Sequence, residues 1–152
     1  MDLRNQFPRS PNDKLAGYVH LARMIDKCRA TLAGTQGEYK YPCPMDQRLL
    51  DFAGITAEQF TAAVRNAQND QALMEWFAQA ATPHSSDDIA RWNQTFLTWE
   101  PDTEEKRAYF KQLRDAVDSS RTDITAWADL LDLDEKRAVP KRTVNPGKML
   151  NE

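Results

Sequence analysis

Two stretches of this sequence combine residue types that could do chemistry. The first, GEYKYPCPMDQR at 37–48, places Cys43 between two prolines, after two tyrosines and before Asp46. If Pro44 is the first residue of a helix, Cys43 is its N-cap, where the helix dipole favours a thiolate. Asp46 would offset part of that effect, and no histidine is close in sequence to act as a base. Cys43 is therefore either a reactive thiol or a small apolar residue at a rigid corner.

The second stretch, HLARMIDKCRA at 20–30, carries charged residues on the side of a helix that should be apolar. At about 100° per residue, Asp26 and Arg29 fall among the apolar positions, three residues apart, where they can pair. A charge against apolar surface costs several kcal/mol unless it is paired and hydrogen-bonded. We therefore expect Asp26 and Arg29 to face inward, to pair, and to find further partners in segment 37–48.

Together the two stretches predict a polar pocket where the first long helix meets the segment that follows it. Such a pocket could bind a small anion, or its carboxylates and Tyr39 could move protons on an anionic metabolite. The alternative is an internal salt-bridge network that pins the connector to the helix. The candidate pocket residues are Arg23, Asp26, Lys27, Arg29, Tyr39, Tyr41 and Asp46.

The sequence lacks the motifs of familiar metal and cofactor sites. The phosphate-binding loop, the dinucleotide fingerprint, HExxH and GxSxG do not occur. His20 and Cys28 are eight residues apart, roughly 12 Å along a helix, which is too far to share a small ion. The acidic run near Asp129 lacks the glycine and final glutamate of a calcium loop. We expect neither a metal nor a cofactor.

Charge and composition limit the classes of partner that we expect for this protein. The 152 residues are 41% hydrophobic and carry a net charge of −3, but residues 49–133 alone carry −8. An acidic centre argues against wrapping nucleic acid, which needs a broad basic face. No apolar run approaches the ~20 residues that span a bilayer, and the first residues lack the apolar centre of a secretory signal. Two cysteines are too few for a disulfide scaffold, so a cytoplasmic protein without membrane or nucleic-acid partners is expected.

Apolar spacing and capping signals predict an all-α, compact single domain of about seven short helices. The first helix is expected from about 12–14 to 33, followed by an irregular connector over 35–43. Residues 1–139 should form the domain and residues 140–152 a loose or docked basic tail. The other helices are expected at 44–53, at 57–67, and from about 70, 85, 102 and 122.

Two further expectations concern local structure. The only strand-like piece is 38–41, because Tyr39 and Tyr41 would share a face if extended. The helix that follows Asp102 is expected to bury a stripe of apolar residues. That stripe consists of Tyr109, Leu113, Ala116 and Val117.

Three long strings resemble a known family. They are PRSPNDKLAGYVHLARMIDKCRA, GEYKYPCPMDQR and RTDITAWADLLDLDE, and the likeness extends from Pro8 to about Glu135. The sequence is similar to the bacterial family called domain of unknown function 5069. The resemblance implies a small, mostly helical bacterial protein and carries over no activity, cofactor or catalytic residue.

Three functions are compatible with these residues. The leading hypothesis is a non-catalytic domain that binds a small anionic molecule or a protein partner through the predicted pocket. The competing hypothesis is a small enzyme that acts on an anionic metabolite by acid–base chemistry. A third is a thiol-based sensor that uses Cys43.

Overall fold

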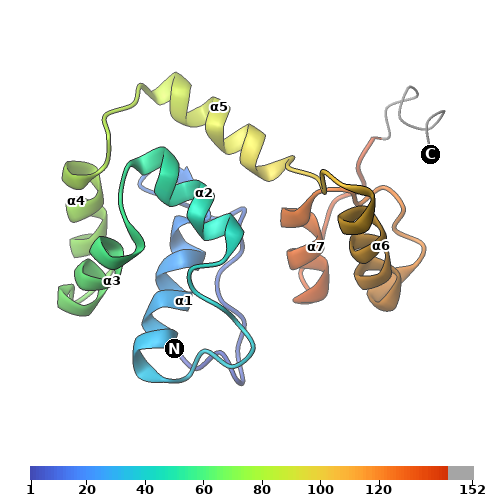
Figure 1. The fold of residues 1–152 in the computed structure, drawn as a ribbon, viewed down its shortest axis with the longest axis horizontal. Helices are drawn as coiled ribbons and strands as arrows, with labels where there is room; N and C mark the ends of the chain where they lie inside the picture. Colours follow the sequence, from blue (N-terminus) through green and yellow to red (C-terminus); the bar gives the residue numbers. More distant parts are fainter. Residues whose placement is uncertain (144–152) are drawn as a thin grey trace. The chain divides into compact units, whose positions relative to one another are not determined.

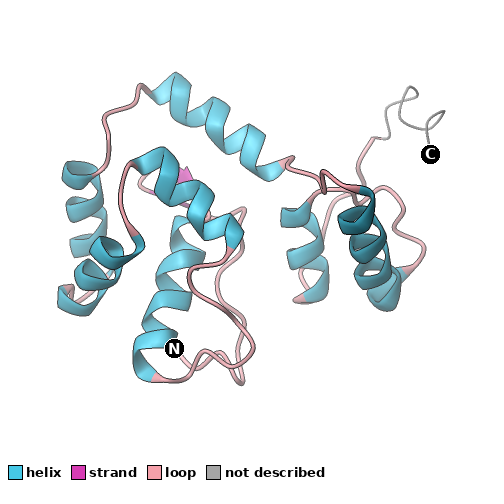
Figure 2. Cartoon of the chain, viewed as in Figure 1, coloured by secondary structure: helices cyan, strands magenta, loops and turns pink. Residues whose placement is uncertain are grey.

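Residues 1–143 are described by a computed structural model, and within them seven helices and one short hairpin form (Figures 1 and 2). The predicted all-helical fold is confirmed. The helices are α1 (Leu21–Ala33), α2 (Pro44–Ala53), α3 (Ala57–Asn66), α4 (Asp70–Ala80), α5 (Ser86–Leu97), α6 (Glu104–Asp118) and α7 (Trp127–Asp134). The strands are β1 (Lys14–Leu15) and β2 (Tyr18–Val19), paired antiparallel.

The chain divides into two compact units, Met1–Asn93 and Gln94–Glu152. The first unit holds α1 to α4 and most of α5, and the second holds α6 and α7. The predicted boundaries, a domain over 1–139 and a tail over 140–152, stay a prediction. Residues 144–152 of that tail lie outside the described residues.

The start of the first helix was predicted wrongly. Residues 14–19 form the β1–β2 hairpin, with Lys14 opposite Val19, and α1 begins only at Leu21. The turn residues Ala16 and Gly17 have φ values of 53° and 85°, the left-handed pair that a two-residue hairpin turn requires. The expected strand at 38–41 does not form, and the segment between α1 and α2 is irregular as predicted.

Helix ends follow their local signals. Cys43 is the N-cap of α2 with Pro44 as the first helical residue, and Gly54 ends the helix with φ 68°. Thr56 and Gln59 form the predicted capping box of α3. The Thr56 hydroxyl accepts from the backbone N–H of Gln59 at 3.1 Å, and the side-chain carbonyl of Gln59 accepts from the backbone N–H of Thr56 at 2.9 Å. These caps were predictable because every group involved lies within four residues.

The core of the first unit is apolar and centred on α1. Helix α1 contacts α3, and α3 lies beside α4 in Figure 1. Phe60 and Phe77 are almost completely buried, and Tyr18 from the hairpin packs edge-on against Phe77 with ring centroids 5.0 Å apart. Burial of such side chains stabilises the unit by about 1.5–3 kcal/mol each.

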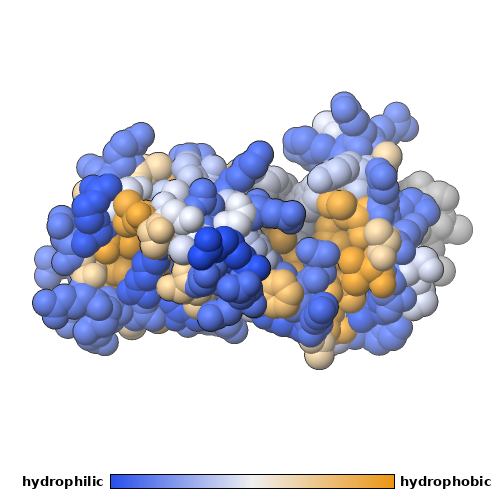
Figure 3. Space-filling model, turned by 90° about the horizontal axis from the view of Figure 1, so that it is seen from below, coloured by the Kyte–Doolittle hydropathy of each residue, from blue (hydrophilic) through white to orange (hydrophobic). Residues whose placement is uncertain are grey.

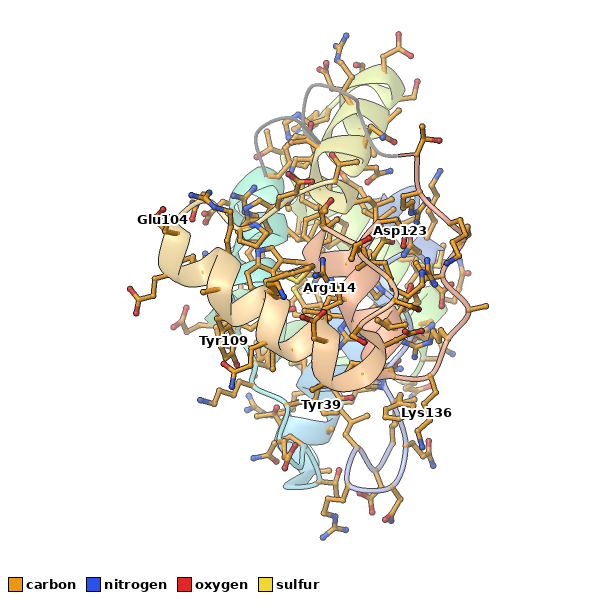
Figure 4. All side chains as sticks on the ribbon, turned by 90° about the vertical axis from the view of Figure 1, so that its right-hand side faces the viewer. Tyr39, Glu104, Tyr109, Arg114, Asp123 and Lys136 are labelled. Atoms are coloured by element: carbon orange, nitrogen blue, oxygen red, sulfur yellow. The ribbon has the colours of Figure 1, made fainter. Side chains whose placement is uncertain are left out.

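The second unit has its own core, and it turns α6 differently from the prediction. Phe110 and Ile124 are buried in it, and the ring of Phe110 packs edge-on against that of Trp127 at 5.1 Å. The residues expected inside face out instead: Tyr109 is 56% exposed, Leu113 37% and Val117 44%. Figure 4 shows Tyr109 at the left of α6 and Asp123 to its right.

The physical reason is a buried arginine. Arg114 is only 9% exposed, and its guanidinium donates to the carbonyl oxygen of Ile124 at 3.2 Å. Arg114 and Phe110 are four residues apart and lie on one face of the helix. Their burial turns Tyr109 and Leu113 toward solvent, and Figure 3 shows apolar side chains at the surface of the face drawn.

Ion pairs tie the last described residues to the second unit. The Arg142 guanidinium donates to both carboxylate oxygens of Asp129, at 2.9 and 2.7 Å, and its backbone N–H donates to Asp123. Among the described residues, no helix has the length and apolar character needed to cross a membrane.

Candidate functional site

The most buried polar group of the first unit is the carboxylate of Asp46. It lies in the first turn of α2 and is 0% exposed. Three donors converge on it: His20 Nε2 and Lys27 Nζ, each at 2.7 Å, and the backbone N–H of Cys43 at 2.9 Å. We call these four residues the Asp46 cluster. Lys27 and Asp46 are residues of the candidate pocket and Cys43 is the candidate thiol, whereas His20 was not predicted to belong to the site.

His20 directly follows the hairpin, and the backbone there holds it in place. Its φ of 70° puts the residue in the left-handed region at the N-cap of α1, and its backbone N–H donates to the carbonyl of Pro11 at 3.0 Å. The imidazole is 0% exposed. Burial lowers the pKa of His20 by more than the neighbouring Asp46 raises it. The ring is therefore neutral near pH 7, with its Nε2–H assigned to the bond with Asp46.

Asp46 has the opposite balance. Burial by itself would raise its pKa, but the hydrogen bonds from His20 and Lys27 and the positive charge of Lys27 outweigh that effect. The net result holds the pKa of Asp46 well below its usual range. Asp46 is consequently a permanent anion that neutralises the buried ammonium of Lys27, and it is a poor proton acceptor.

The predicted pairing of Asp26 with Arg29 is wrong. Asp26 is 3% exposed and is bound by Arg9, which donates from Nε at 3.0 Å, from a terminal nitrogen at 3.0 Å and from its backbone N–H at 2.9 Å. Arg29 instead donates to Asp70 on α4 at 2.8 Å, and Arg9 reaches the other oxygen of Asp70 at 2.8 Å. The four residues form a chain of alternating charges, the Arg9 network.

This pairing was not predicted because the partners of Asp26 and Arg29 lie far from them along the chain. Arg9 comes from the segment before the hairpin and Asp70 from α4, so neither is visible in the local pattern of α1. Arginine forms two parallel bonds to a carboxylate, and the backbone N–H of Arg9 adds a third to Asp26. Inward-facing charge at position 26 was correctly expected, and no contact of Asp26 or Arg29 with segment 37–48 is present among the described hydrogen bonds.

The remaining candidates are Arg23, Tyr39 and Tyr41, and of these Arg23 contacts the Arg9 network. The guanidinium of Arg23 is 5.6 Å from the ring centre of Tyr39, a cation–π distance, and it donates to the carbonyl of Arg9 at 3.3 Å. The hydroxyl of Tyr41 donates to the carbonyl of Ala57 at 3.1 Å, and burial raises the pKa of Tyr41. The tyrosines thus hold the connector against α1 and α3 and do not touch Asp26.

Two grooves open on the first unit. One of about 400 Å³ lies between α1, α3 and the connector, and Tyr41 is the candidate residue that lines it, beside Cys28 and Thr61. A second, of about 610 Å³, lies between α3 and α4. It is lined by Gly54, Ile55, Gln59, Ala62, Ala63, Asn66, Ala67, Ala72, Trp76 and Ala80. Small side chains on both helices leave room there, with Trp76 as an apolar wall.

The site chemistry follows from these partners. Among residues 1–143 no group of three or more His, Cys, Asp or Glu side chains is placed to hold a metal ion. The thiol of Cys43 accepts from the Lys27 ammonium at 3.1 Å and is half-buried. Arg9, His20 and Asp70 were not predicted from the sequence. The local signal for Arg9 was the charge at position 26, which required a cation that the helix itself does not supply.

Comparison with known proteins agrees with the strings singled out in the sequence. No curated protein matches the chain. A family model, described as a domain of unknown function (DUF5069), matches residues 5–137. This range includes every residue of the Asp46 cluster and of the Arg9 network. The chain therefore belongs to the DUF5069 family.

Proposed function

We propose that this chain is a non-catalytic binding or interaction domain that works in the bacterial cytoplasm. The supporting observation is that the carboxylates of the predicted pocket are engaged by cations: Asp46 by Lys27, and Asp26 by Arg9. The pKa of Asp46 lies well below its usual range, so this carboxylate is badly matched to general acid–base work, which needs a pKa near the working pH. The charge of this carboxylate stabilises the fold, and we expect ligands to bind at another surface.

The groove between α3 and α4 is the binding surface that we favour. Its volume of about 610 Å³ is in the range of small-molecule sites. The carbonyl of Gln59 is occupied by the Thr56 N–H, so the amide nitrogen of Gln59 remains to donate to a ligand at the groove edge. The apolar wall and this donor fit a small molecule, or a partner side chain, that combines an apolar body with an acceptor or anionic group.

A thermal-shift screen of anionic metabolites tests this function. A ligand at 100 times its dissociation constant stabilises a protein by about 2.7 kcal/mol, which raises the melting temperature measurably. Ala62→Trp, which fills the groove, should abolish the shift, whereas Ala78→Trp, on α4 outside the groove, should keep it. A ligand whose shift survives Ala62→Trp contradicts the location, and a panel without any shift contradicts small-molecule binding.

One observation favours the competing function, a small enzyme acting on an anionic metabolite. The neutral, buried His20 hydrogen-bonded to a carboxylate is the arrangement that orients a catalytic imidazole. Turnover of a metabolite by the wild-type protein that disappears in His20→Asn, with the fold retained, would support the enzyme. Stabilisation by the same metabolite without any product would favour the binding domain.

A further inference from the structure

Lys27 and Cys43 bring a nitrogen and a sulfur into contact. The ammonium of Lys27 on α1 lies 3.1 Å from Sγ of Cys43 at the start of α2. One carboxylate fixes both residues, because Asp46 accepts from Lys27 Nζ at 2.7 Å and from the Cys43 backbone N–H at 2.9 Å. The two atoms are therefore held together by the fold and do not meet by chance at the surface.

Access to the two atoms is unequal. Lys27 is 4% exposed, so its nitrogen stays against the sulfur and cannot swing into solvent. Cys43 is half-buried, whereas Cys28 is buried, so Cys43 is the cysteine more open to a small oxidant such as a hydroperoxide. Susceptibility of cysteine to oxidation follows its exposure.

We propose that Cys43 and Lys27 are a redox pair in which a hydroperoxide oxidises the thiol and the lysine amine captures the product as a sulfur–nitrogen cross-link. In ordinary thiol switches a second cysteine captures the sulfenic acid, and a backbone nitrogen is the known alternative. Here the nearest nucleophile in contact is an amine. This inference goes beyond the proposed binding function and does not depend on it.

The chemistry balances in two steps. Hydrogen peroxide oxidises the Cys43 thiol to a sulfenic acid, its O–O bond breaks, and one water leaves. The Lys27 ammonium then loses one proton to solvent, and its amine attacks the sulfenic sulfur. An S–N bond forms, the S–O bond breaks, and a second water carries away the hydroxyl and one of the two remaining nitrogen-bound protons, so that one N–H stays in the cross-link. The sulfur supplies the two electrons that reduce the peroxide, and a thiol reductant restores both side chains.

The other cysteine is a poor resolving thiol. Cys28 is 0% exposed, donates to the Thr61 hydroxyl at 3.9 Å, and lies in the apolar core around α1. Burial raises its pKa, so the thiol rather than the thiolate is present. Cys28 therefore stays reduced while Cys43 reacts, which makes it an internal control.

The test is mass spectrometry of the full chain after hydrogen peroxide, in a Cys28→Ala background that removes any disulfide. The cross-link lowers the intact mass by about 2 Da, joins the peptides that contain residues 27 and 43, and is reversed by dithiothreitol. Peptide mapping of the wild-type chain gives the same readout should Cys28→Ala fold poorly.

Lys27→Arg is the matched control. Arginine keeps the positive charge, but its guanidinium stays protonated and does not attack sulfur. In this variant the linked peptides should vanish, and Cys43 should be trapped as a sulfenic acid by dimedone or gain about 32 Da as a sulfinic acid. Linked peptides in Lys27→Arg would overturn the proposal. So would wild-type Cys43 that is unreactive, or that proceeds to the sulfinic acid without any link to Lys27.

Discussion

Asp46 is the acceptor that holds His20 and Lys27 in the interior, so its charge has a measurable role at the scale of one residue. Asp46→Asn keeps the shape but leaves the Lys27 ammonium, 4% exposed, without its anion. Breaking a buried pair in this way costs about 3–5 kcal/mol. Urea unfolding should show that loss, whereas Asp51→Asn, at the exposed end of the same helix, should change stability by less than about 0.5 kcal/mol.

His20 predicts a pH dependence. Its folded-state pKa lies below the unfolded value of about 6.5. At pH values between the two, His20 is protonated in the unfolded chain and neutral in the folded chain. The contribution of His20 to the free energy of unfolding is therefore fully present above the unfolded-state pKa. It decreases as the pH falls, by up to about 2 kcal/mol between pH 7 and pH 5. His20→Asn, which tolerates the left-handed backbone, should remove this part of the slope in urea unfolding at several pH values. An unchanged slope would mean that His20 binds its proton equally well in the folded and the unfolded chain.

At the scale of the element, Gly54 is required at the end of α2. Its φ is 68°, and an added Cβ would collide with the Thr82 hydroxyl, whose residue also donates its backbone N–H to Ala53. Gly34 ends α1 with φ 71° but has open space around it. Alanine at Gly34 should cost about 1–2 kcal/mol from the backbone alone, and alanine at Gly54 about 1–3 kcal/mol more. Equal losses in thermal unfolding would show that Thr82 moves aside freely.

The orientation of α6 is tested by two neighbouring aromatic residues. Phe110 is 4% exposed in the second core and Tyr109 is 56% exposed. Phe110→Ala should destabilise the second unit by about 3–5 kcal/mol, and Tyr109→Ala by less than about 0.5 kcal/mol. Differential scanning calorimetry of both variants checks this, and a larger loss for Tyr109→Ala would restore the orientation expected from sequence.

Sequence predicted those elements whose signals are local. The capping box at Thr56 and the Cys43–Pro44 start of α2 are examples, because donor, acceptor and fixed φ all lie within one turn. The hairpin was missed because Ala16 and His20 adopt left-handed backbone without being glycine or asparagine. Such a conformation is set by the packing of Tyr18 and His20 on the folded unit, which no short window contains.

At the scale of the whole molecule, the Arg9 network connects segments that are far apart in sequence. Asp26 is 17 residues from Arg9 and Asp70 is 61, so the cation that neutralises Asp26 could not be found from helical periodicity. The charge pattern showed that Asp26 needed a partner and left its identity open. The expectation that Asp26 faces inward was consequently right, and the expectation that it pairs with Arg29 was wrong.

Arg9 therefore carries a prediction for the first unit as a whole. Arg9→Met removes the cation from Asp26, which is 3% exposed, and should lower the free energy of unfolding by about 3–5 kcal/mol. Arg4→Met removes an arginine whose pair with Asp2 is on the surface, and it should leave the free energy of unfolding close to the wild-type value. Circular dichroism during urea unfolding distinguishes the two, and similar losses would contradict a special role for Arg9.

The place of Arg9 ahead of the hairpin has a consequence for proteolysis. Its guanidinium reaches Asp26 in α1 and Asp70 in α4 from a leading peptide that also hydrogen-bonds Thr35 through the backbone of Leu3. Cleavage of one peptide bond between Arg9 and the hairpin would remove the covalent link between Arg9 and the rest of the unit. The leading peptide would then be retained only by its own contacts, and its dissociation would loosen two helices without touching either of them.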